Sequence, residues 1–320
     1  MNSVRFVWVG FHAEGVAPLG ALLAAGAPIV AVLTLRRDLA ARRSGGAAYT
    51  PICARHGVPL HEIANINDPD ALHLLRQAAP DVVFVIGWHQ IVRPEALRIP
   101  RLGMIGAHAS LLPLNRGSAP INWALIHGDR HSGNTLIWLA EDVDAGEIID
   151  QTAFPISRYD TCTTLYQRVA ESNRDMLLRL LPRLYAGERP GRAQQVNGEP
   201  VLPRRRPADG VIDWRQPSPR VYDFVRALTR PYPGAFSTLD GRRWRVWHAA
   251  LPPVVDADPE RAGEVLGPVV SPVPEACGQA VRCADGVLVL LELEADDGTV
   301  LRGRDLSEQP WTGKRWAADG

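Results

Sequence analysis

The chain has 320 residues, 46% of them apolar and 22% charged, which is typical of a soluble globular protein of roughly two domains. Lys plus Arg and Asp plus Glu number 35 each, so no overall field draws the protein to nucleic acid or to an acidic membrane. The four cysteines lack any CxxC or metal-ligand spacing, and the N-terminus shows no signal-peptide pattern. We therefore expect reduced thiols, no metal site, no membrane segment and a cytoplasmic location.

The N-terminal half alternates between strand and helix patterns. Residues 4–35 predict a strand, a glycine-bearing turn, a helix and a second, almost wholly apolar strand. Such a βαβ unit predicts a parallel sheet that is covered on both faces. Helices at 52–56 and 69–78, a strand at 59–63 and a strongly apolar strand at 81–87 follow.

The C-terminal half changes character twice. Residues 159–184 have apolar residues at spacings of three and four and predict a long amphipathic helix. The segment 188–207 is rich in Pro, Gly and Arg and predicts a linker. Beyond it, a helix at 219–228 and short alternating strands separated by Asp-Gly turns predict a small β-barrel. We therefore predict one domain at 1–187 and another at 208–320.

The residues with the most chemical potential lie between 103 and 151. A short apolar run ends at His108, and open α/β sheets bind ligands at the carboxyl ends of their strands. Asp142 and Asp144 follow later in a loop that ends with Gly. His108 and Asp144 can converge from separate loops as an acid–base pair. A lone His at a strand end is also often a satisfied structural residue, so that alternative stays open.

Several stretches of the sequence resemble one family. HASLLPLNRGSAPINWALIHGD and SGNTLIWLAEDVDAGEII resemble the signature of the folate-dependent formyltransferases, typified by methionyl-tRNA formyltransferase. GWHQ at 87–90 and NINDP at 65–69 look most like the branch that formylates amino groups on nucleotide-linked sugars. DGVIDW and VRALTRPYPGAF resemble the C-terminal domain of that family. The resemblance implies an α/β fold with a Rossmann-like parallel sheet in the N-terminal domain and a C-terminal OB-like β-barrel.

The resemblance also implies one-carbon transfer from 10-formyltetrahydrofolate to an amine, without a metal. It gives His108 oxyanion contact and proton shuttling, and gives Asp144 the orientation of His108 and acceptance of the amine's proton. Gly106 stands where the family has its third catalytic residue, an Asn, whose amide donates to the developing oxyanion. A water, a substrate group, Gln90 or Asn115 are the candidate replacements for that donor.

Further residues receive binding roles from the resemblance. For Asp142 a solvated loop carboxylate is the preferred alternative, and His89 is expected to be a residue of the pocket rim rather than a catalyst. For Arg116 a structural role is equally credible. The residues assigned to the folate side are Trp88, His89, Gln90, Ser110, Leu112, Pro113 and Asp142, and those assigned to the acceptor side are Asn115, Arg116 and Gly117.

The acceptor and the reaction stay open at this point. A small-molecule amine is the preferred acceptor, with a nucleotide-linked amino sugar first and an amino acid or natural-product amine second. Initiator methionyl-tRNA is the third choice because the charge is balanced. The alternatives are a 10-formyltetrahydrofolate hydrolase and a non-catalytic folate-binding homologue, since one of three site residues is missing. The basic segment 36–50 either steers an anionic substrate or is a solvated surface, and the oligomeric state is open.

Overall fold

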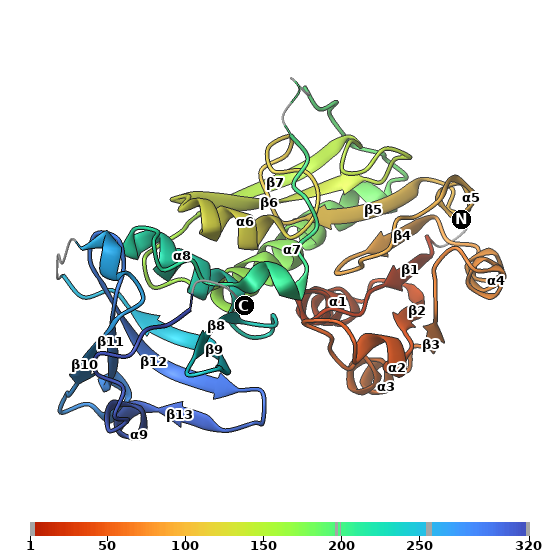
Figure 1. Ribbon diagram of the computed structural model, residues 1–320. Helices are drawn as coiled ribbons and strands as arrows, with labels where there is room; N and C mark the ends of the chain where they lie inside the picture. The colour runs from red at the N-terminus through yellow and green to blue at the C-terminus, as the bar shows by residue number, and fades with distance from the viewer. Residues whose placement is uncertain (1–3, 196–197, 199, 254–257, 318–320) are drawn as a thin grey trace. The chain divides into compact units, whose positions relative to one another are not determined.

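The computed structural model describes residues 4–195, 198, 200–253 and 258–317. Contacts between residues divide the chain into two compact units, whose elements are labelled in Figure 1. The first unit takes in residues up to 120, 131–155 and 165–204, and the second takes in 121–130, 156–164 and the chain from 205. The linear boundaries at 187 and 208 stay a prediction, and residues 196, 197 and 199 of the predicted linker lie outside the described residues.

The first unit is built on a seven-stranded sheet with the order β3-β2-β1-β4-β5-β6-β7. Neighbours among the first five strands pair in parallel, whereas β6 and β7 add an antiparallel edge. The sheet confirms the predicted α/β class. Its strands are β1 (Phe6–Val9), β2 (Ile29–Leu35), β3 (Leu60–Ile63), β4 (Val82–Val85), β5 (Gly103–His108), β6 (His131–Trp138) and β7 (Ile148–Pro155).

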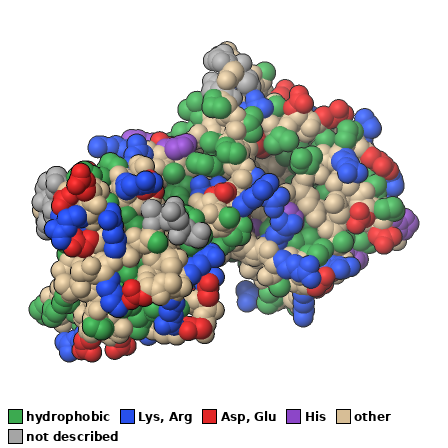
Figure 2. All heavy atoms as spheres, in the orientation of Figure 1, with side chains coloured by type: hydrophobic (Ala, Val, Ile, Leu, Met, Phe, Trp, Pro, Cys, Tyr) green, Lys and Arg blue, Asp and Glu red, His purple; other side chains and the backbone are tan. Residues whose placement is uncertain are grey.

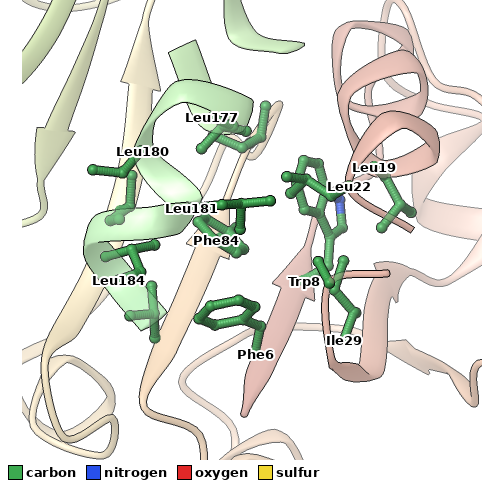
Figure 3. Close-up of a cluster of buried hydrophobic side chains, with 14 of the residues drawn as sticks. Phe6, Trp8, Leu19, Leu22, Ile29, Phe84, Leu177, Leu180, Leu181 and Leu184 are labelled. Carbon is green, nitrogen blue, oxygen red and sulfur yellow. The ribbon is translucent and has the colours of Figure 1, made fainter. Parts of the chain in front are cut away.

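Helices cover both faces of this sheet, because alternate residues of the central strands are apolar in both directions. Phe6, Trp8 and Phe84 pack against one set of helices, whereas Val7 and Val83 face the other. Figure 3 shows the first set, in which leucines of α1 and α7 close over the aromatic rings. The helices of this unit are α1 (Val16–Ala24), α2 (Arg37–Ala40), α3 (Thr50–His56), α4 (Pro69–Ala78), α5 (Pro94–Leu97) and most of α7 (Cys162–Tyr185).

The strand order determines which loops meet at the carboxyl edge of the sheet. The chain runs outward from β1 to β2 and β3 and then returns to place β4 on the other side of β1. Ligands of open α/β sheets bind at such a switch point. The 3-10 helix η1 (Ala13–Gly15) follows β1, residues 87–90 follow β4, and His108 ends β5.

The second unit contains an antiparallel sheet with the order β10-β11-β12-β9-β8, to which β13 adds by pairing with β12. The turn between β8 and β9 has positive φ at both Asp240 and Gly241, as a two-residue hairpin requires. The predicted antiparallel pairing is confirmed, and closure into an OB-like barrel stays a prediction. The strands are β8 (Ala235–Leu239), β9 (Arg242–Ala250), β10 (Val265–Val269), β11 (Gly278–Arg282), β12 (Val287–Ala295) and β13 (Val300–Arg302).

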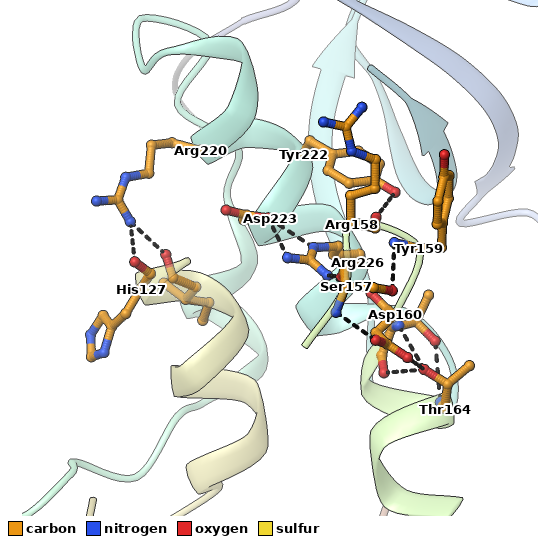
Figure 4. Close-up of polar contacts among 12 residues, drawn as sticks. His127, Ser157, Arg158, Tyr159, Asp160, Thr164, Arg220, Tyr222, Asp223 and Arg226 are labelled. Atoms are coloured by element: carbon orange, nitrogen blue, oxygen red, sulfur yellow. Dashed lines mark hydrogen bonds and ion pairs between the residues drawn. The ribbon is translucent and has the colours of Figure 1, made fainter. Parts of the chain in front are cut away.

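A buried polar cluster explains why residues 156–164 group with the second unit (Figure 4). The Arg226 guanidinium pairs with Asp223 at 2.8 Å and donates to the carbonyls of Ser157 and Asp160 at 2.8 and 2.7 Å. A buried cation that is fully paired in this way is costly to expose alone. The helices of this unit are α6 (Pro120–His127, from residue 121), α8 (Ser218–Leu228) and α9 (Gly303–Ser307).

Neither α6 nor α9 was predicted from the sequence. Among the described residues, every helix is either too short or too polar to span a lipid bilayer.

Candidate active site

His108 ends β5 with its side chain only 9% exposed. Its Nε2 lies 2.8 Å from the carbonyl oxygen of Asn115, and its Nδ1 lies 3.4 Å from Oδ1 of Asp144. Both neighbours are hydrogen-bond acceptors, so a ring that carries protons on both nitrogens satisfies both of them. The two predicted catalytic residues therefore meet, and each ring nitrogen of His108 faces a hydrogen-bond acceptor.

A tight loop brings the Asp144 carboxylate to His108. Asp144 has a φ of 53°, and its Oδ2 accepts a hydrogen bond of 2.9 Å from the backbone N–H of Gly117. A Cβ on Gly146 would lie 1.6 Å from the carbonyl oxygen of Trp138, so only glycine fits there. The Asp-x-Gly sequence thus turns the loop sharply enough to join His108 and Gly117 through one carboxylate.

The loop after His108 is held by side chains of the antiparallel edge. The Ser110 hydroxyl donates to a carbonyl four residues on at 2.7 Å, and its own carbonyl accepts from the Thr135 hydroxyl at 2.6 Å. Gln151 donates to the carbonyl of Leu112 at 2.9 Å, and the Leu112–Pro113 bond is cis. Ser110 and Leu112 therefore shape the loop, while their predicted contact with folate stays a prediction.

Part of the predicted linker lies along both site loops. We call residues 190–195 and 200–204 the strap. Within the strap, Gln194 donates to the carbonyls of Asp144 and Gly146 at 2.8 and 2.7 Å. Leu202 donates to the Arg116 carbonyl at 2.7 Å, and a Cβ on Gly117 would lie 2.5 Å from the Leu202 carbonyl oxygen. The strap therefore supports the loops that carry Asp144 and Gly117.

The remaining acceptor-side residues make contacts within the site loops, and their predicted contact with an acceptor stays a prediction. Asn115 has a φ of 55° and presents its carbonyl to His108. The Arg116 guanidinium lies 3.4 Å from the carbonyl of Val143 and so bridges two loops. Asp142 is exposed, as a solvated loop carboxylate would be.

Trp88 and His89, which follow β4, lie against Phe11, and we call these three side chains the aromatic rim. The His89 ring lies 5.0 Å from that of Phe11 and 5.8 Å from that of Trp88. Burial lowers the pKa of His89 to about 4, with a further contribution from the positive charges of Arg43 and Arg204. His89 is therefore neutral at pH 7, and its place on a pocket rim stays a prediction.

Two features near Gly106 bear on the hydrogen-bond donor that the family's Asn would provide, and neither supplies one. The Gln90 amide accepts from the backbone of Ile66 at 3.0 Å and donates to that of Ala64 at 2.8 Å, so it holds a loop. A Cβ on Gly106 would lie 2.5 Å from Cδ2 of Leu139. An apolar side chain therefore fills the place where the family's carboxamide would begin.

The structure also brings residues to the site that the sequence analysis did not single out. Glu14, in η1, lies near enough to His108 for the two charges to interact. The backbone N–H of Glu14 donates to Nδ1 of His12 at 3.4 Å, and Oε2 of Glu14 lies 3.8 Å from the same nitrogen. No motif marks these two residues, and their place after the first strand of the sheet was the only available signal.

The predicted absence of a metal site stays a prediction. In the described ranges, no three His, Cys, Asp or Glu side chains are grouped so as to hold a metal ion. All four cysteines are buried and unpaired.

Comparison with solved structures identifies the fold. HypX from Aquifex aeolicus in complex with tetrahydrofolic acid is 18% identical, with a TM-score of 0.67 over 94% of this chain and 46% of that chain. The chain thus spans about half the length of HypX. The sugar 3N-formyl transferase WlaRD, in the presence of dTDP and 5-N-formyl-THF, is 15% identical, with a TM-score of 0.63 over 91% and 98%. Methionyl-tRNA formyltransferase from Clostridium thermocellum is 16% identical, with a TM-score of 0.59 over 78% and 94%.

Family assignment comes from the sequence matches, since such low identities show the fold alone. Residues 21–181 match the formyl transferase family, and residues 205–310 match the formyl transferase C-terminal domain. The first match runs from within α1 to within α7 and includes His108 and Asp144, and with the second it accounts for most of the chain. The chain therefore belongs to the formyl transferase family.

Proposed function

We propose that this protein transfers a formyl group from 10-formyltetrahydrofolate to the amine of a small molecule. The observation that carries the proposal is the contact of His108 with Asp144, at 3.4 Å, at the carboxyl edge of the sheet. Formyl transfer moves one proton away from the attacking amine and supplies one to the leaving nitrogen. An imidazole beside a carboxylate manages such proton transfers near neutral pH.

Each residue of the pair has its own part in the proposed reaction. The amine attacks the formyl carbon, a new C–N bond forms, and the formyl oxygen becomes an oxyanion. Cationic His108 stabilises this oxyanion, while Asp144 accepts the amine's proton, directly or through water. The bond from the formyl carbon to the folate nitrogen then breaks, and that nitrogen takes up the proton that the amine gave to Asp144. Because Nε2 of His108 bonds to Asn115, the formyl oxygen must compete with that carbonyl for direct contact.

The aromatic rim supports a folate as the donor. Phe11, Trp88 and the neutral ring of His89 offer flat apolar surface at the switch point, which suits a planar heterocycle. The Trp88 Nε1 is buried and has no hydrogen-bond partner among the described residues, so a ligand acceptor there would satisfy it. HypX and WlaRD, whose folds are similar, were solved with tetrahydrofolic acid and with 5-N-formyl-THF respectively.

Charge supports a small acceptor rather than tRNA. The chain has no net charge, and Figure 2 shows basic and acidic side chains mixed on the visible face. A tRNA-binding surface would instead gather positive charge, because affinity for nucleic acid depends on phosphate contacts. Among small acceptors, a nucleotide-linked amino sugar is preferred, since WlaRD is a sugar 3N-formyl transferase of similar fold.

Product analysis with formyl-labelled 10-formyltetrahydrofolate tests the proposal. With nucleotide-linked amino sugars or other amines present, the label is expected in a formylated amine. Label released as formate at a rate independent of amines would instead identify a hydrolase. Folate binding without turnover would identify a non-catalytic homologue. His108→Ala separates enzymatic from spontaneous formate release in each arm.

A further inference from the structure

The oxyanion needs a hydrogen-bond donor that the motif residues do not provide. Gly106 has no side chain, and Leu139 occupies the adjacent space. The two ring nitrogens of His108 already face Asn115 and Asp144, and the Gln90 amide holds a neighbouring loop. Losing one such donor from an optimised site costs about 100- to 1,000-fold in rate. A working transferase with this site therefore needs a donor from another element.

Glu14 occupies a suitable place. It lies just after β1, and the order β1-β4-β5 brings the ends of these three strands together. Gly87, after β4, has a φ of 66°, and a Cβ on it would lie 3.2 Å from Cγ and 3.3 Å from Oε1 of Glu14. The Glu14 side chain therefore lies close to the end of the neighbouring strand. Glu14 also lies near enough to His108 for the two charges to interact.

The Glu14 carboxyl group is shielded from water and poorly satisfied. Its side chain is 14% exposed, and Oε2 has no hydrogen-bond partner among the described residues. Burial raises the pKa of Glu14, while positive charge on His12 and His108 opposes that rise less strongly. The Tyr49 phenol is the further titratable group that interacts with it. Burial thus favours the neutral acid, which carries an O–H donor.

We propose that Glu14, in its neutral form, donates this hydrogen bond to the formyl oxygen and so replaces the carboxamide missing at position 106. The inference rests on the proposed formyl transfer. When the amine's electron pair forms the new C–N bond, the carbonyl electron pair moves onto oxygen beside the Glu14 O–H. The pair returns when the bond to the folate nitrogen breaks, and Glu14 keeps its proton throughout. Other enzymes use a buried, neutral carboxylic acid as an oxyanion donor in the same way.

Two substitutions separate a donor from a carboxylate. Glu14→Ala removes the donor, and kcat is expected to fall by about 100- to 1,000-fold. Glu14→Gln keeps an N–H donor of nearly the same shape, so kcat is expected to fall by no more than about tenfold. If Glu14→Gln is as slow as Glu14→Ala, or if Glu14→Ala matches the wild type, the proposal is wrong. Thermal unfolding and binding of a folate analogue are measured on each variant to confirm that it is folded.

The pH profile gives a readout that a merely structural role would not change. The neutral acid is present below the pKa of Glu14 and is lost above it, so kcat of the wild type should decline on the alkaline side. The neighbouring groups His12, His108 and Tyr49 are the same in both proteins, whereas an amide at position 14 does not ionise. Activity of Glu14→Gln should therefore persist to higher pH than that of the wild type. Identical alkaline limbs would contradict the proposal.

Restoring the family's carboxamide provides a rescue. Gly106→Asn alone meets Leu139 and is not expected to raise activity. The triple variant that combines Gly106→Asn, Leu139→Ala and Glu14→Ala should have a kcat at least about tenfold higher than the double variant Leu139→Ala with Glu14→Ala. A triple variant that binds the folate analogue normally yet gains nothing would count against the proposal. If the wild type forms no formylated amine, the proposed function is wrong. If the wild type is active but Glu14→Ala and Glu14→Gln have the same kcat, only the role of Glu14 is wrong.

Discussion

Two sides of the candidate site are constructed differently. On the side of His108 and Asp144, both ring nitrogens of His108 and both oxygens of Asp144 face a polar partner, and the carboxylate joins His108 to the backbone of Gly117. On the side of η1, Glu14 keeps an oxygen without a hydrogen bond among the described residues. A satisfied network holds its members in place, whereas an unsatisfied buried group retains hydrogen-bonding capacity for a ligand. The difference indicates that the first side fixes geometry and the second side is completed by substrate.

The largest effect is expected from breaking the first side at its centre. His108→Ala removes the proton carrier, and Asp144→Asn keeps an oxygen for Gly117 but loses the charge. Each change should lower kcat by about 100- to 10,000-fold, the usual contribution of general acid–base catalysis. Steady-state formyl transfer measures the loss.

Glu141→Gln is the matched control, because Glu141 lies in the same loop with its side chain 68% exposed. Its turnover should stay within twofold of the wild type, roughly the scatter expected for a surface substitution. Full activity of Asp144→Asn would show that the contact with His108 is structural only.

A backbone change at Gly117 should have the next largest effect. Gly117→Ala forces a side chain into a φ of 106° and against the carbonyl oxygen of Leu202. The strain should lower the midpoint of thermal unfolding. Displacement of the Gly117 N–H, which donates to Asp144, should lower kcat. Positive φ alone costs an L-residue about 1–2 kcal/mol, and the contact with backbone adds to this.

Gly187→Ala isolates the backbone contribution, since Gly187 has a φ of 74° but nothing within 4 Å of the added Cβ. It should lower the unfolding midpoint less than Gly117→Ala and leave kcat unchanged. Equal effects of the two substitutions would show that the strap does not constrain the loop at Gly117.

A smaller effect is expected at the strap. Gln194→Ala removes two hydrogen bonds to the carbonyls of Asp144 and Gly146. Two neutral hydrogen bonds contribute roughly 1–2 kcal/mol, so kcat should fall by about five- to thirtyfold through a misplaced Asp144. The exposed Gln195→Ala is the control and should match the wild type. A raised KM with unchanged kcat would indicate that Gln194 serves substrate binding instead.

The smallest effect should be that of salt. Residues 204–245 hold ten Arg against four Asp, but the chain as a whole is neutral. If the acceptor is small, log kcat/KM against log salt concentration should have a shallow slope. Binding through several phosphates would give a slope of several units, because each contact releases counterions. Such a slope would favour a tRNA acceptor.

The sequence predicted those elements whose pattern reflects burial. The strands at β1, β2 and β4 are nearly continuous apolar runs because helices cover both of their faces. By contrast, β6 was not predicted, because its first half is polar although Asn134 within it is buried: the Asn134 amide nitrogen donates to Ser172 and Asn173 of α7. A hydrogen bond between side chains so distant in sequence leaves no periodic pattern.

The site divides in the same way. His108 and Asp144 were predicted because a local motif holds each of them. Glu14 was not, since a Glu beside a glycine near a strand end normally lies in water. Only the strand order brings it to His108. Residues that act through local backbone geometry can be found from sequence, whereas residues gathered by topology cannot.

The contact between Gly106 and Leu139 also bears on how this site can change over evolutionary time. An Asn placed at 106 first meets Leu139, whereas a smaller residue placed at 139 first leaves an unfilled space in a partly buried position. Each single step is therefore unfavourable alone, although both together restore room for a carboxamide. Exchange of both residues therefore has to pass through a less stable intermediate if it occurs one position at a time. A laboratory redesign of this site should accordingly vary the two positions together.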